Sequence, residues 1–280
     1  MPLDAPIPAT PFASRRLLVN GVELNVVVEG EGPDVLLLHG FPDDHTVWRE
    51  QIPMLVAAGY RVIAPDTRGC GDSAIPAKVS DYRVDRLVDD LVGVLDALGI
   101  DKVRLVAHDW GAVQGWFLAM RHPERVERYV ALSVGHPNAY ARGGLMQKLR
   151  GGYIAFFQLR GLAEFLLTRF DYALWRTMVG FPEEFEACKA RLKRPGRLTA
   201  GINYYRANLG MILPREYPPV TIPVVGIWSD GDRFLVEGQM TNSAQYCAAG
   251  FRYERVDGAN HWVQLTAPAK VNPLLLASLA

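Results

Sequence analysis

The segment VAHDWGAVQGW, residues 106–116, constrains the fold of this chain more than any other stretch. An apolar run that starts at Val103 leads into a tight turn, and a helix-like pattern follows Gly111. Asp109 stands at the tip of the turn, and the small residues Ala107 and Gly111 lie two positions away on either side. The pattern predicts that a strand turns sharply into a helix and lifts Asp109 out of a sheet. The first amides of that helix would stabilise an anion there.

Short apolar runs alternate with helical patterns along the rest of the chain. Asn20-Gly21 is typical of a hairpin turn, and Ser80 or Asp81 is expected to cap the start of a helix that ends at Gly99. The alternation predicts an α/β fold, a mostly parallel sheet with helices on both faces. The expected strands are 35–40, 61–66, 103–107, 129–134, 223–230 and 252–258, of which 35–40, 61–66 and 129–134 are expected to be buried. The expected helices are 45–59, 80–99 and one from about Pro268.

The alternation stops after His136-Pro137. Residues 138–215 contain helical, aromatic-rich stretches and no convincing strand, which predicts a helical lid. The α/β core is then expected from 1–137 and 216–280. The basic stretch 189–197 is interpreted as a solvated helix face, and the Pro- and Ala-rich residues 1–14 as a loose lead-in.

Bulk composition excludes several classes of function. The 280 residues carry no formal net charge, which gives no reason to expect a nucleic-acid partner. The three cysteines, Cys70, Cys188 and Cys247, show no metal-binding spacing, so we expect free thiols and no metal or cofactor. No signal-peptide pattern and no apolar run of about 18 residues is present. We therefore expect a cytoplasmic protein without a membrane partner, of undetermined oligomeric state.

A carboxylate at the elbow suits a particular chemistry. Asp109 could attack an electrophilic carbon that carries a leaving group and form an ester that is itself hydrolysable. The alternative is an ordinary aspartate that caps the helix. The sequence His39-Gly40-Phe41-Pro42 follows the strand 35–38, so the amides of Phe41 and Trp110 could form an oxyanion hole. The alternative there is an ordinary turn.

A base and its acid are expected near the end of the chain. His261 follows the strand 252–256 and could face the elbow, and it is preferred over His136. Asp230 and Asp232 both follow the strand 223–229 and could orient the histidine; we favour Asp232. The order nucleophile, acid, histidine is the one found in α/β-hydrolases.

With these segments in place, the chain resembles the α/β-hydrolase superfamily, in particular the epoxide hydrolases related to the soluble type. The resemblance rests on LLLHGFPDDHTVWREQIPMLVAAGYRVIAPDTRGCGDS, VAHDWGAVQGW, HPERV, SDGDRFL and HWVQL, and it covers nearly the full length. It implies an eight-stranded type of sheet with a lid. The same branch contains haloalkane and fluoroacetate dehalogenases. Ala107, Cys70 and Asn260 depart from the usual pattern.

The resemblance also implies two lid tyrosines. GYIAFFQLRGLAE and INYYRAN match the lid segments of such epoxide hydrolases and give Tyr153 and Tyr205. Tyr204 and Tyr172 are the less favoured alternatives, and either position could be a packed aromatic. The substrate pocket is expected to be apolar and to include His39, Pro42, Phe156, Phe157 and Tyr204.

The resulting hypothesis is hydrolysis of a small apolar epoxide by water to a vicinal diol. Asp109 forms the covalent ester, Tyr153 and Tyr205 protonate the ring oxygen, and His261 with Asp232 activates the water. One alternative is a dehalogenase with the same Asp-His-Asp set. An alternative of another class is a non-catalytic ligand-binding protein on this fold.

Overall fold

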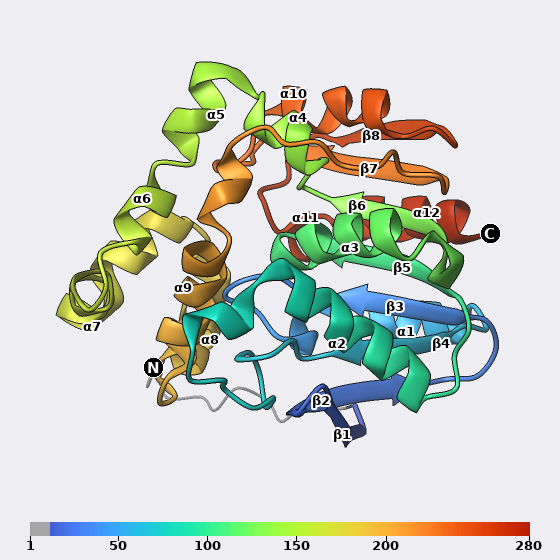
Figure 1. Cartoon of the computed structure of the whole chain (residues 1–280), viewed down its shortest axis with the longest axis horizontal. Helices are drawn as coiled ribbons and strands as arrows, with labels where there is room; N and C mark the ends of the chain where they lie inside the picture. Colours follow the sequence, from blue (N-terminus) through green and yellow to red (C-terminus); the bar gives the residue numbers. More distant parts are fainter. Residues whose placement is uncertain (1–11) are drawn as a thin grey trace.

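A single mixed sheet organises the chain in the computed structural model, which describes residues 12–280 (Figure 1). Its eight strands have the order β1-β2-β4-β3-β5-β6-β7-β8, and β3 to β8 are parallel, whereas β1 and β2 pair antiparallel. This confirms the fold class and the hairpin at Asn20-Gly21. The strands are β1 (Ser14–Val19), β2 (Val22–Glu29), β3 (Asp34–Leu38), β4 (Arg61–Pro65), β5 (Val103–His108), β6 (Val126–Leu132), β7 (Val224–Ser229) and β8 (Phe251–Val256).

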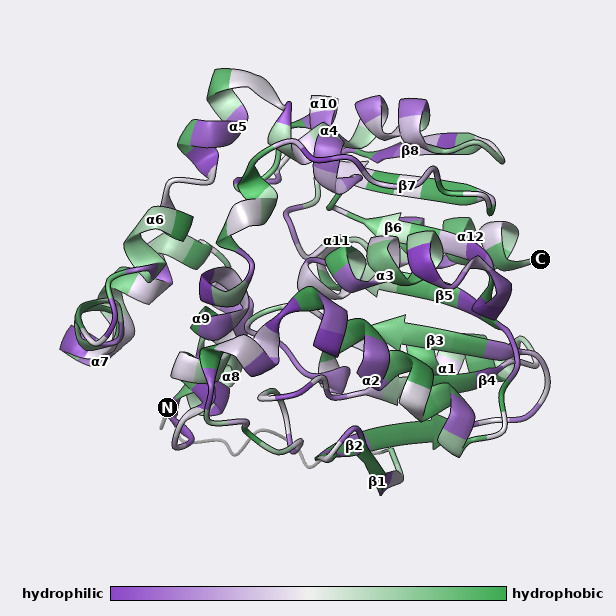
Figure 2. Ribbon diagram, viewed as in Figure 1, coloured by the Kyte–Doolittle hydropathy of each residue, from purple (hydrophilic) through white to green (hydrophobic). Residues whose placement is uncertain are grey.

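Helices cover both faces of the sheet. The helices α2 (Val84–Ala97) and α3 (Trp110–Arg121) lie on one face, and α1 (Gln51–Ala57) and α12 (Pro268–Leu279) on the other (Figure 1). The side chains of successive strand residues point to opposite faces of the sheet. In β3, for example, Leu36 packs in the cluster with α2 and α3, and Leu37 in the cluster with α1 and α12. The central strands β3, β5 and β7 accordingly consist mainly of apolar residues, whereas the edge strand β8 carries hydrophilic ones as well (Figure 2).

A group of helices lies at the carboxyl ends of the parallel strands (Figure 1). These elements follow β6 and precede β7, so they correspond to the helical segment expected within 138–215; the lid boundaries at 138 and 215 stay a prediction. We call this group the cap. It consists of α4 (Pro137–Ala141), α5 (Gly144–Arg150), α6 (Tyr153–Phe157), α7 (Leu162–Val179), η4 (Pro182–Glu184), α8 (Phe185–Lys193), α9 (Arg197–Ala207) and η5 (Leu209–Ile212).

The remaining elements are short and connect the core. They are η1 (His45–Trp48), η2 (Val79–Tyr82), η3 (Pro123–Arg125), α10 (Glu237–Thr241), η6 (Asn242–Tyr246) and α11 (Val263–Thr266). No helix among residues 12–280 has the length and apolar character needed to traverse a bilayer. The three cysteines are buried and unbonded, as expected.

Two local expectations were wrong. Ser80 and Asp81 lie in η2 and do not cap α2, which begins at Val84; its first amide donates instead to Asn208 Oδ1 of the cap, at 2.9 Å. The stretch 189–197 is not simply a solvated face, because the Arg191 side chain is only 12% exposed. The expected loose lead-in lies outside the described residues except for its last three positions.

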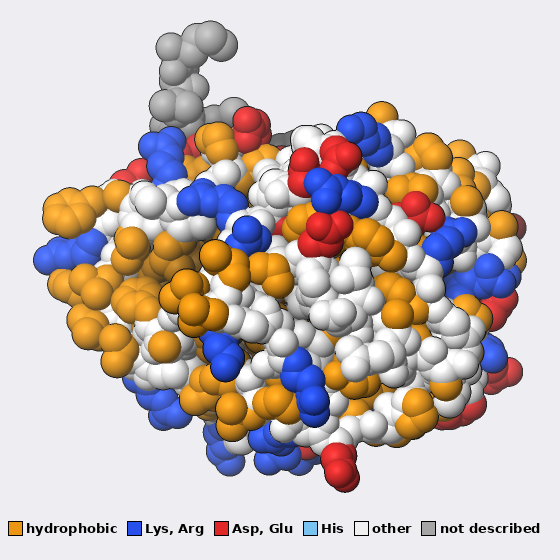
Figure 3. Space-filling model, turned by 90° about the horizontal axis from the view of Figure 1, so that it is seen from above, with side chains coloured by type: hydrophobic (Ala, Val, Ile, Leu, Met, Phe, Trp, Pro, Cys, Tyr) orange, Lys and Arg blue, Asp and Glu red, His pale blue; other side chains and the backbone are white. Residues whose placement is uncertain are grey.

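Exposed apolar side chains are unevenly distributed over the surface. Seen from above, hydrophobic side chains gather on the side formed by the cap, with lysine and arginine side chains around them (Figure 3). The cap therefore presents apolar groups outward as well as toward the sheet.

Candidate active site

Asp109 occupies a strained turn between β5 and α3. Its backbone has φ 52° and ψ −122°, in a region that residues with a side chain rarely adopt. The turn is feasible because its neighbours are glycines: a Cβ on Gly40 would overlap the Asp109 side chain, and one on Gly111 would overlap the backbone of Leu38 and His39. The strand-turn-helix predicted from residues 106–116 is present.

The two oxygens of the Asp109 carboxylate have different partners. The amide of Phe41 donates to Oδ1 at 2.8 Å, and Nε2 of His261 lies 3.4 Å from Oδ2. Burial alone raises the pKa of Asp109, but the hydrogen bond and charge of His261 outweigh burial and lower it. Asp109 is therefore an anion at neutral pH, with one oxygen held by the backbone and the other facing the imidazole.

His261 is held by Asp232. Its Nδ1 lies 2.8 Å from Asp232 Oδ2, and the other oxygen of Asp232 accepts hydrogen bonds from the amides of Phe234 and Leu235. Asp230 is exposed and accepts from the amide of Gly258, so it does not contact the histidine. Of the two candidate acids, the structure brings only Asp232 to His261.

The charges around His261 set its protonation. Burial lowers the pKa of this imidazole, but the negative charges and hydrogen bonds of Asp232 and Asp109 raise it to about 10. The resting site therefore holds an imidazolium between two carboxylates. Loss of either carboxylate charge would lower the pKa of His261, because a nearby negative charge stabilises the protonated imidazolium.

Tyr153 and Tyr205 come from different cap helices and meet above Asp109. Tyr153 begins α6, Tyr205 lies in α9, and their ring centroids are 5.6 Å apart. Both side chains line the two cavities that reach Asp109 and His261. Burial raises the pKa of each phenol well above its ordinary value, so both hydroxyls remain protonated.

Two cavities adjoin Asp109 and are mostly apolar. The larger comprises about 710 Å³ and the smaller about 380 Å³ of space, part of which is open to solvent. Both are lined by Asp109, Tyr153, Tyr205, Phe234 and His261. The larger extends past Tyr140, Met211 and Ile212, and the smaller past Phe41, Pro42, Phe157, Trp175 and Met178.

Three residues expected in the pocket lie elsewhere. His39 is buried below the turn, where its Nε2 accepts from the amide of Thr67 at 3.0 Å. Tyr204 points away from the cavities and donates to Thr67 Oγ1 at 2.9 Å or to the carbonyl of Arg68 at 2.7 Å. Phe156 packs against Phe157 outside both cavities. Pro42 and Phe157 do line the smaller cavity, as expected.

The remaining alternatives do not reach the site. His136 stacks on Tyr246, with ring centroids 4.3 Å apart, and lines neither cavity. Tyr172 is buried within α7, away from Asp109. Cys70 is buried as well, and burial raises the pKa of its thiol to about 12, which leaves no reactive thiolate.

Sequence reasoning missed a buried carboxylate behind the Phe41 turn. Asp43 accepts a hydrogen bond from the indole Nε1 of Trp262 at 2.7 Å, and Arg191 of α8 lies 3.3 Å from its other oxygen. Burial raises the pKa of Asp43 to about 7, although Arg191 and Trp262 act in the opposite direction. The signal was present as an acid directly after HGFP, but its partners are distant in the sequence.

Phe234 was missed as well. Its ring centroid lies 5.1 Å from that of His261 and 5.7 Å from that of Tyr153. It follows Asp232 by two residues, so the turn that places the acid also places this aromatic side chain in the cavity.

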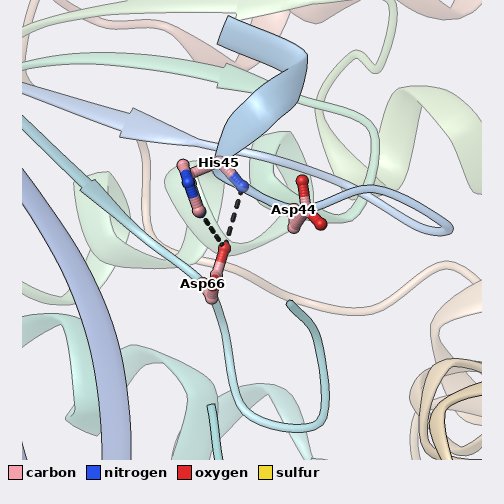
Figure 4. A group of neighbouring side chains, drawn as sticks. All are labelled: Asp44, His45 and Asp66. Atoms are coloured by element: carbon pink, nitrogen blue, oxygen red, sulfur yellow. Dashed lines mark hydrogen bonds and ion pairs between the residues drawn. The ribbon is translucent and has the colours of Figure 1, made fainter. Parts of the chain in front are cut away.

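A further cluster has the residue types of a metal site, but both oxygens of its Asp66 already accept hydrogen bonds from protein groups. One ligand atom each of Asp44, His45 and Asp66 lies within 4.8 Å of the others (Figure 4). Asp66 Oδ1 accepts from the amide and Nδ1 of His45, and Oδ2 accepts from Asn25 and the amide of Asp72. Burial raises the pKa of Asp66, but His45 outweighs it and lowers that pKa to about 2. We interpret the cluster as structural, because Asp66 joins the segments that carry Asn25, His45 and Asp72 by hydrogen bonds.

A family model described as the alpha/beta hydrolase fold matches residues 33–268. The chain belongs to the α/β-hydrolase family. This α/β-hydrolase is 37% identical to the AB hydrolase superfamily protein YfhM of Bacillus subtilis, over 93% of the chain and 95% of that protein. It is 33% identical to epoxide hydrolase A of Mycobacterium tuberculosis, over 93% of the chain and 95% of that protein.

Solved structures give the same result. A crystal structure of Bacillus megaterium epoxide hydrolase in complex with an inhibitor matches with a TM-score of 0.85 and 28% identity, over 95% of this chain and 99% of that one. Epoxide hydrolase A from Mycobacterium thermoresistibile matches with a TM-score of 0.80 and 31% identity, over 96% of this chain and 98% of that one. The predicted resemblance of this α/β-hydrolase to epoxide hydrolases is confirmed.

Proposed function

We propose that this α/β-hydrolase is an epoxide hydrolase that forms a covalent ester on Asp109 and releases a vicinal diol. The observation that carries the proposal is the convergence of an anionic Asp109, a base-acid pair and two protonated tyrosines on the same cavity. A carboxylate can open the ring, a phenol can protonate the departing oxygen, and a histidine can drive hydrolysis.

The unequal environments of the two Asp109 oxygens support different roles for them in the first step. Oδ1 is held by the Phe41 amide, so Oδ2 attacks a ring carbon of the epoxide. A carbon–oxygen bond forms at Oδ2 as the ring carbon–oxygen bond breaks. The leaving oxygen stays on the substrate and takes a proton from Tyr153 or Tyr205. Their raised pKa keeps these protons available at neutral pH.

The second step uses the base. Esterification removes the charge of Asp109, which helped to raise the pKa of His261, so His261 then loses its proton more easily. Neutral His261 takes a proton from water, and the hydroxide attacks the ester carbonyl carbon. Oδ1 becomes the oxyanion, stabilised by the Phe41 amide and, in this proposal, by the amide of Trp110. The carbonyl then re-forms and the ester bond breaks, and the departing oxygen takes the proton of the new Asp109 carboxyl group. The proton that His261 first lost restores the tyrosinate, so the diol leaves with Asp109, His261 and the phenol in their starting states.

The two cavities favour an apolar epoxide with unequal substituents. Asp109 lies where they meet, so a bound epoxide ring would direct one substituent into each. The larger cavity would accept the bulkier group. Neither cavity is lined by Lys, Arg or Glu, which disfavours a charged substrate.

The cavities offer few free donors to stabilise a departing halide, whereas they hold two tyrosines that could protonate the oxygen of an epoxide. Of the three indoles that line the cavities, Trp175 donates its Nε1 to Cys188 Sγ at 3.1 Å and Trp262 donates to Asp43 at 2.7 Å. These two N–H groups are therefore occupied, and only Trp110 could offer an indole donor. The tyrosine pair has no need to protonate a halide, whereas an alkoxide requires a proton.

The test combines a substrate panel with trapping of the ester. Wild type should hydrolyse an aryl epoxide such as styrene oxide to the diol. His261→Gln should be alkylated without turnover, so its intact mass should increase by one epoxide, and peptide mapping should place the adduct on Asp109. His122, which is partly exposed and lines neither cavity, offers a matched control, because His122→Gln should behave as wild type. Halide release from haloalkanes with no epoxide turnover would replace the proposal by a dehalogenase, and absence of any adduct would indicate a non-catalytic binder.

A further inference from the structure

The outer side of the cap carries many exposed apolar side chains that the reaction proposed above does not use. Isolated exposed apolar residues are common, but a dense set on one side of a protein indicates a binding surface. We call this set the cap apolar surface; Figure 3 shows hydrophobic side chains gathered on this side of the molecule. Its nine residues are Leu145, Met146, Leu149, Leu159, Leu162, Phe165, Leu166, Phe170 and Leu174.

The helix α7 shows that this exposure is systematic. Ala163 and Leu167 are fully buried against the molecule, whereas Leu162, Phe165 and Leu166, at helical spacing, face solvent. The first half of α7 is thus apolar on two sides. A helix that is hydrophobic beyond its buried stripe requires a second apolar environment. In α5, Leu145, Met146 and Leu149 repeat the arrangement, being more than half exposed, around the buried Gln147.

The centre of α7 projects an aromatic side chain. Its helical backbone is interrupted from Arg169 to Tyr172, where Phe170, Asp171 and Tyr172 have positive φ. This turn leaves Phe170 89% exposed. Large aromatic side chains at such positions are typical of segments that insert into the headgroup region of a lipid bilayer.

The charges of the same segment are predominantly positive. Residues 142–176 contain six basic and two acidic residues, a net charge of +4 in a chain whose formal net charge is zero. The two acids are already paired: Glu164 with Arg206, and Asp171 with Lys189 and Lys193. They therefore do not neutralise the exposed cations, which are Arg142, Lys148, Arg160, Arg169 and Arg176.

This combination decides between two occupants of the surface. A second copy of the chain in a two-fold contact would bring two copies of the same net-positive surface together, which is unfavourable. An anionic lipid surface would accept the apolar side chains and attract the cations together. The Arg169 guanidinium lies 4.4 Å from the Phe165 ring centroid, so charge and aromatic ring are presented side by side. We propose that the cap apolar surface docks on membranes that contain anionic lipids.

Peripheral docking needs no spanning segment. The expectation of no membrane partner rested on the lack of a long apolar run and of a signal peptide, and neither bears on a surface assembled from α5, α7 and the loop that precedes α7. The inference is also independent of the reaction, because none of the nine residues lines a cavity that reaches Asp109.

Vesicle flotation tests the docking. Wild-type protein should float with vesicles of phosphatidylcholine mixed with phosphatidylglycerol, and bind pure phosphatidylcholine vesicles more weakly. Phe165→Ser with Phe170→Ser should weaken binding at least about tenfold, because two large apolar groups are lost. Lys148→Gln, Arg160→Gln and Arg169→Gln together should weaken binding to the anionic vesicles roughly 100-fold, at about fivefold for each cation.

Matched controls lie on β1 and beside β5. Leu18→Ser removes a side chain that is 76% exposed, and Arg15→Gln with Lys102→Gln removes exposed cations; all should bind vesicles as wild type does. Far-UV circular dichroism and the midpoint of chemical denaturation should be unchanged in every variant, which shows that each is folded whether or not the protein turns over epoxides. If wild-type protein floats with neither kind of vesicle, the proposal is overturned. A dimer in sedimentation velocity that Phe165→Ser with Phe170→Ser dissociates, without vesicle binding, would show instead an interface between copies.

Discussion

Arg191 of the cap helix α8 lies 3.3 Å from Asp43, the residue that follows the Phe41-Pro42 turn. The same carboxylate accepts the indole hydrogen of Trp262, the neighbour of His261. One buried group thus joins the cap, the turn that carries the Phe41 amide and the loop that carries the base. Disturbing this group should affect both stability and the geometry of the site.

Arg191→Met should lower the free energy of unfolding by about 3 kcal/mol near pH 8, because it leaves the buried Asp43 carboxylate without its cation. Chemical denaturation measures the loss. Arg194→Met is the matched control, since Arg194 and its partner Asp72 are about half exposed and such a pair contributes about 0–1 kcal/mol. Equal losses in the two variants would contradict the structural role of the Arg191–Asp43 pair.

Asp43 should also make stability depend on pH. Its pKa is raised from 3.8 to about 7, first by burial, so the folded state binds this proton more tightly than the unfolded state does. The stability that the protonated form contributes is fully present below the unfolded pKa and is lost as pH rises through about 7. Asparagine does not titrate. As pH rises from 3.8 to about 7, the free energy of unfolding of Asp43→Asn should therefore increase relative to that of wild type, by on the order of 1.4 kcal/mol for each unit of pKa shift. Denaturation of both proteins across this range measures the difference, and a constant difference would contradict the shift.

The two chemical steps should respond differently to pH. Alkylation requires the Asp109 anion, whose pKa is lowered, so its rate should be flat through neutral pH. Ester hydrolysis requires neutral His261, whose pKa is about 10 while both carboxylates are charged. In the ester one of those charges is gone, so the rate of hydrolysis should rise with pH around a pKa below that value. Acid-quench measurement of the Asp109 ester separates the two rates. Hydrolysis that does not change with pH would exclude His261 as the base.

The success of sequence reasoning depended on how local each signal was. The turn around Asp109 is specified by its own neighbours, because Gly111 and Gly40 are needed wherever backbone and side chain approach so closely. The central strands β3 to β7 were found because each is a mainly apolar run bounded by turn residues. Asp232 could not be separated from Asp230 by pattern alone, since both stand in the same turn and differ only in the direction of the side chain.

Contacts between distant segments could not be read from the sequence. Asn208 caps α2 from a distance of 124 residues, so the local candidates Ser80 and Asp81 looked sufficient. Tyr204 and Tyr205 are adjacent on one helix, and only the packing of α9 decides that Tyr205 faces Asp109 while Tyr204 bonds to Thr67. The break in α7 could not be predicted from the sequence, because residues 162–179 contain no glycine or proline.

The tyrosine pair gives the most discriminating prediction. Removing one hydroxyl should slow alkylation by up to about 10²–10³, by analogy with the loss of one oxyanion-hole donor. The loss in Tyr153→Phe or Tyr205→Phe alone can be smaller, because both phenols line the same cavities and either can donate a proton. The double variant has no donor left and should lose ester formation almost completely. It should remain folded, since phenylalanine preserves the ring contacts of both residues.

Single-turnover ester formation on an aryl epoxide measures this for wild type, both single variants and the double variant. Tyr172→Phe is the matched control, because this cap tyrosine lines neither cavity at Asp109. Its rate should equal that of wild type. If the double variant alkylates Asp109 at the wild-type rate, the two tyrosines only pack against the substrate and the epoxide chemistry proposed for them is wrong. A protonated leaving oxygen is what separates epoxide opening from halide release, so this measurement also distinguishes the two reactions.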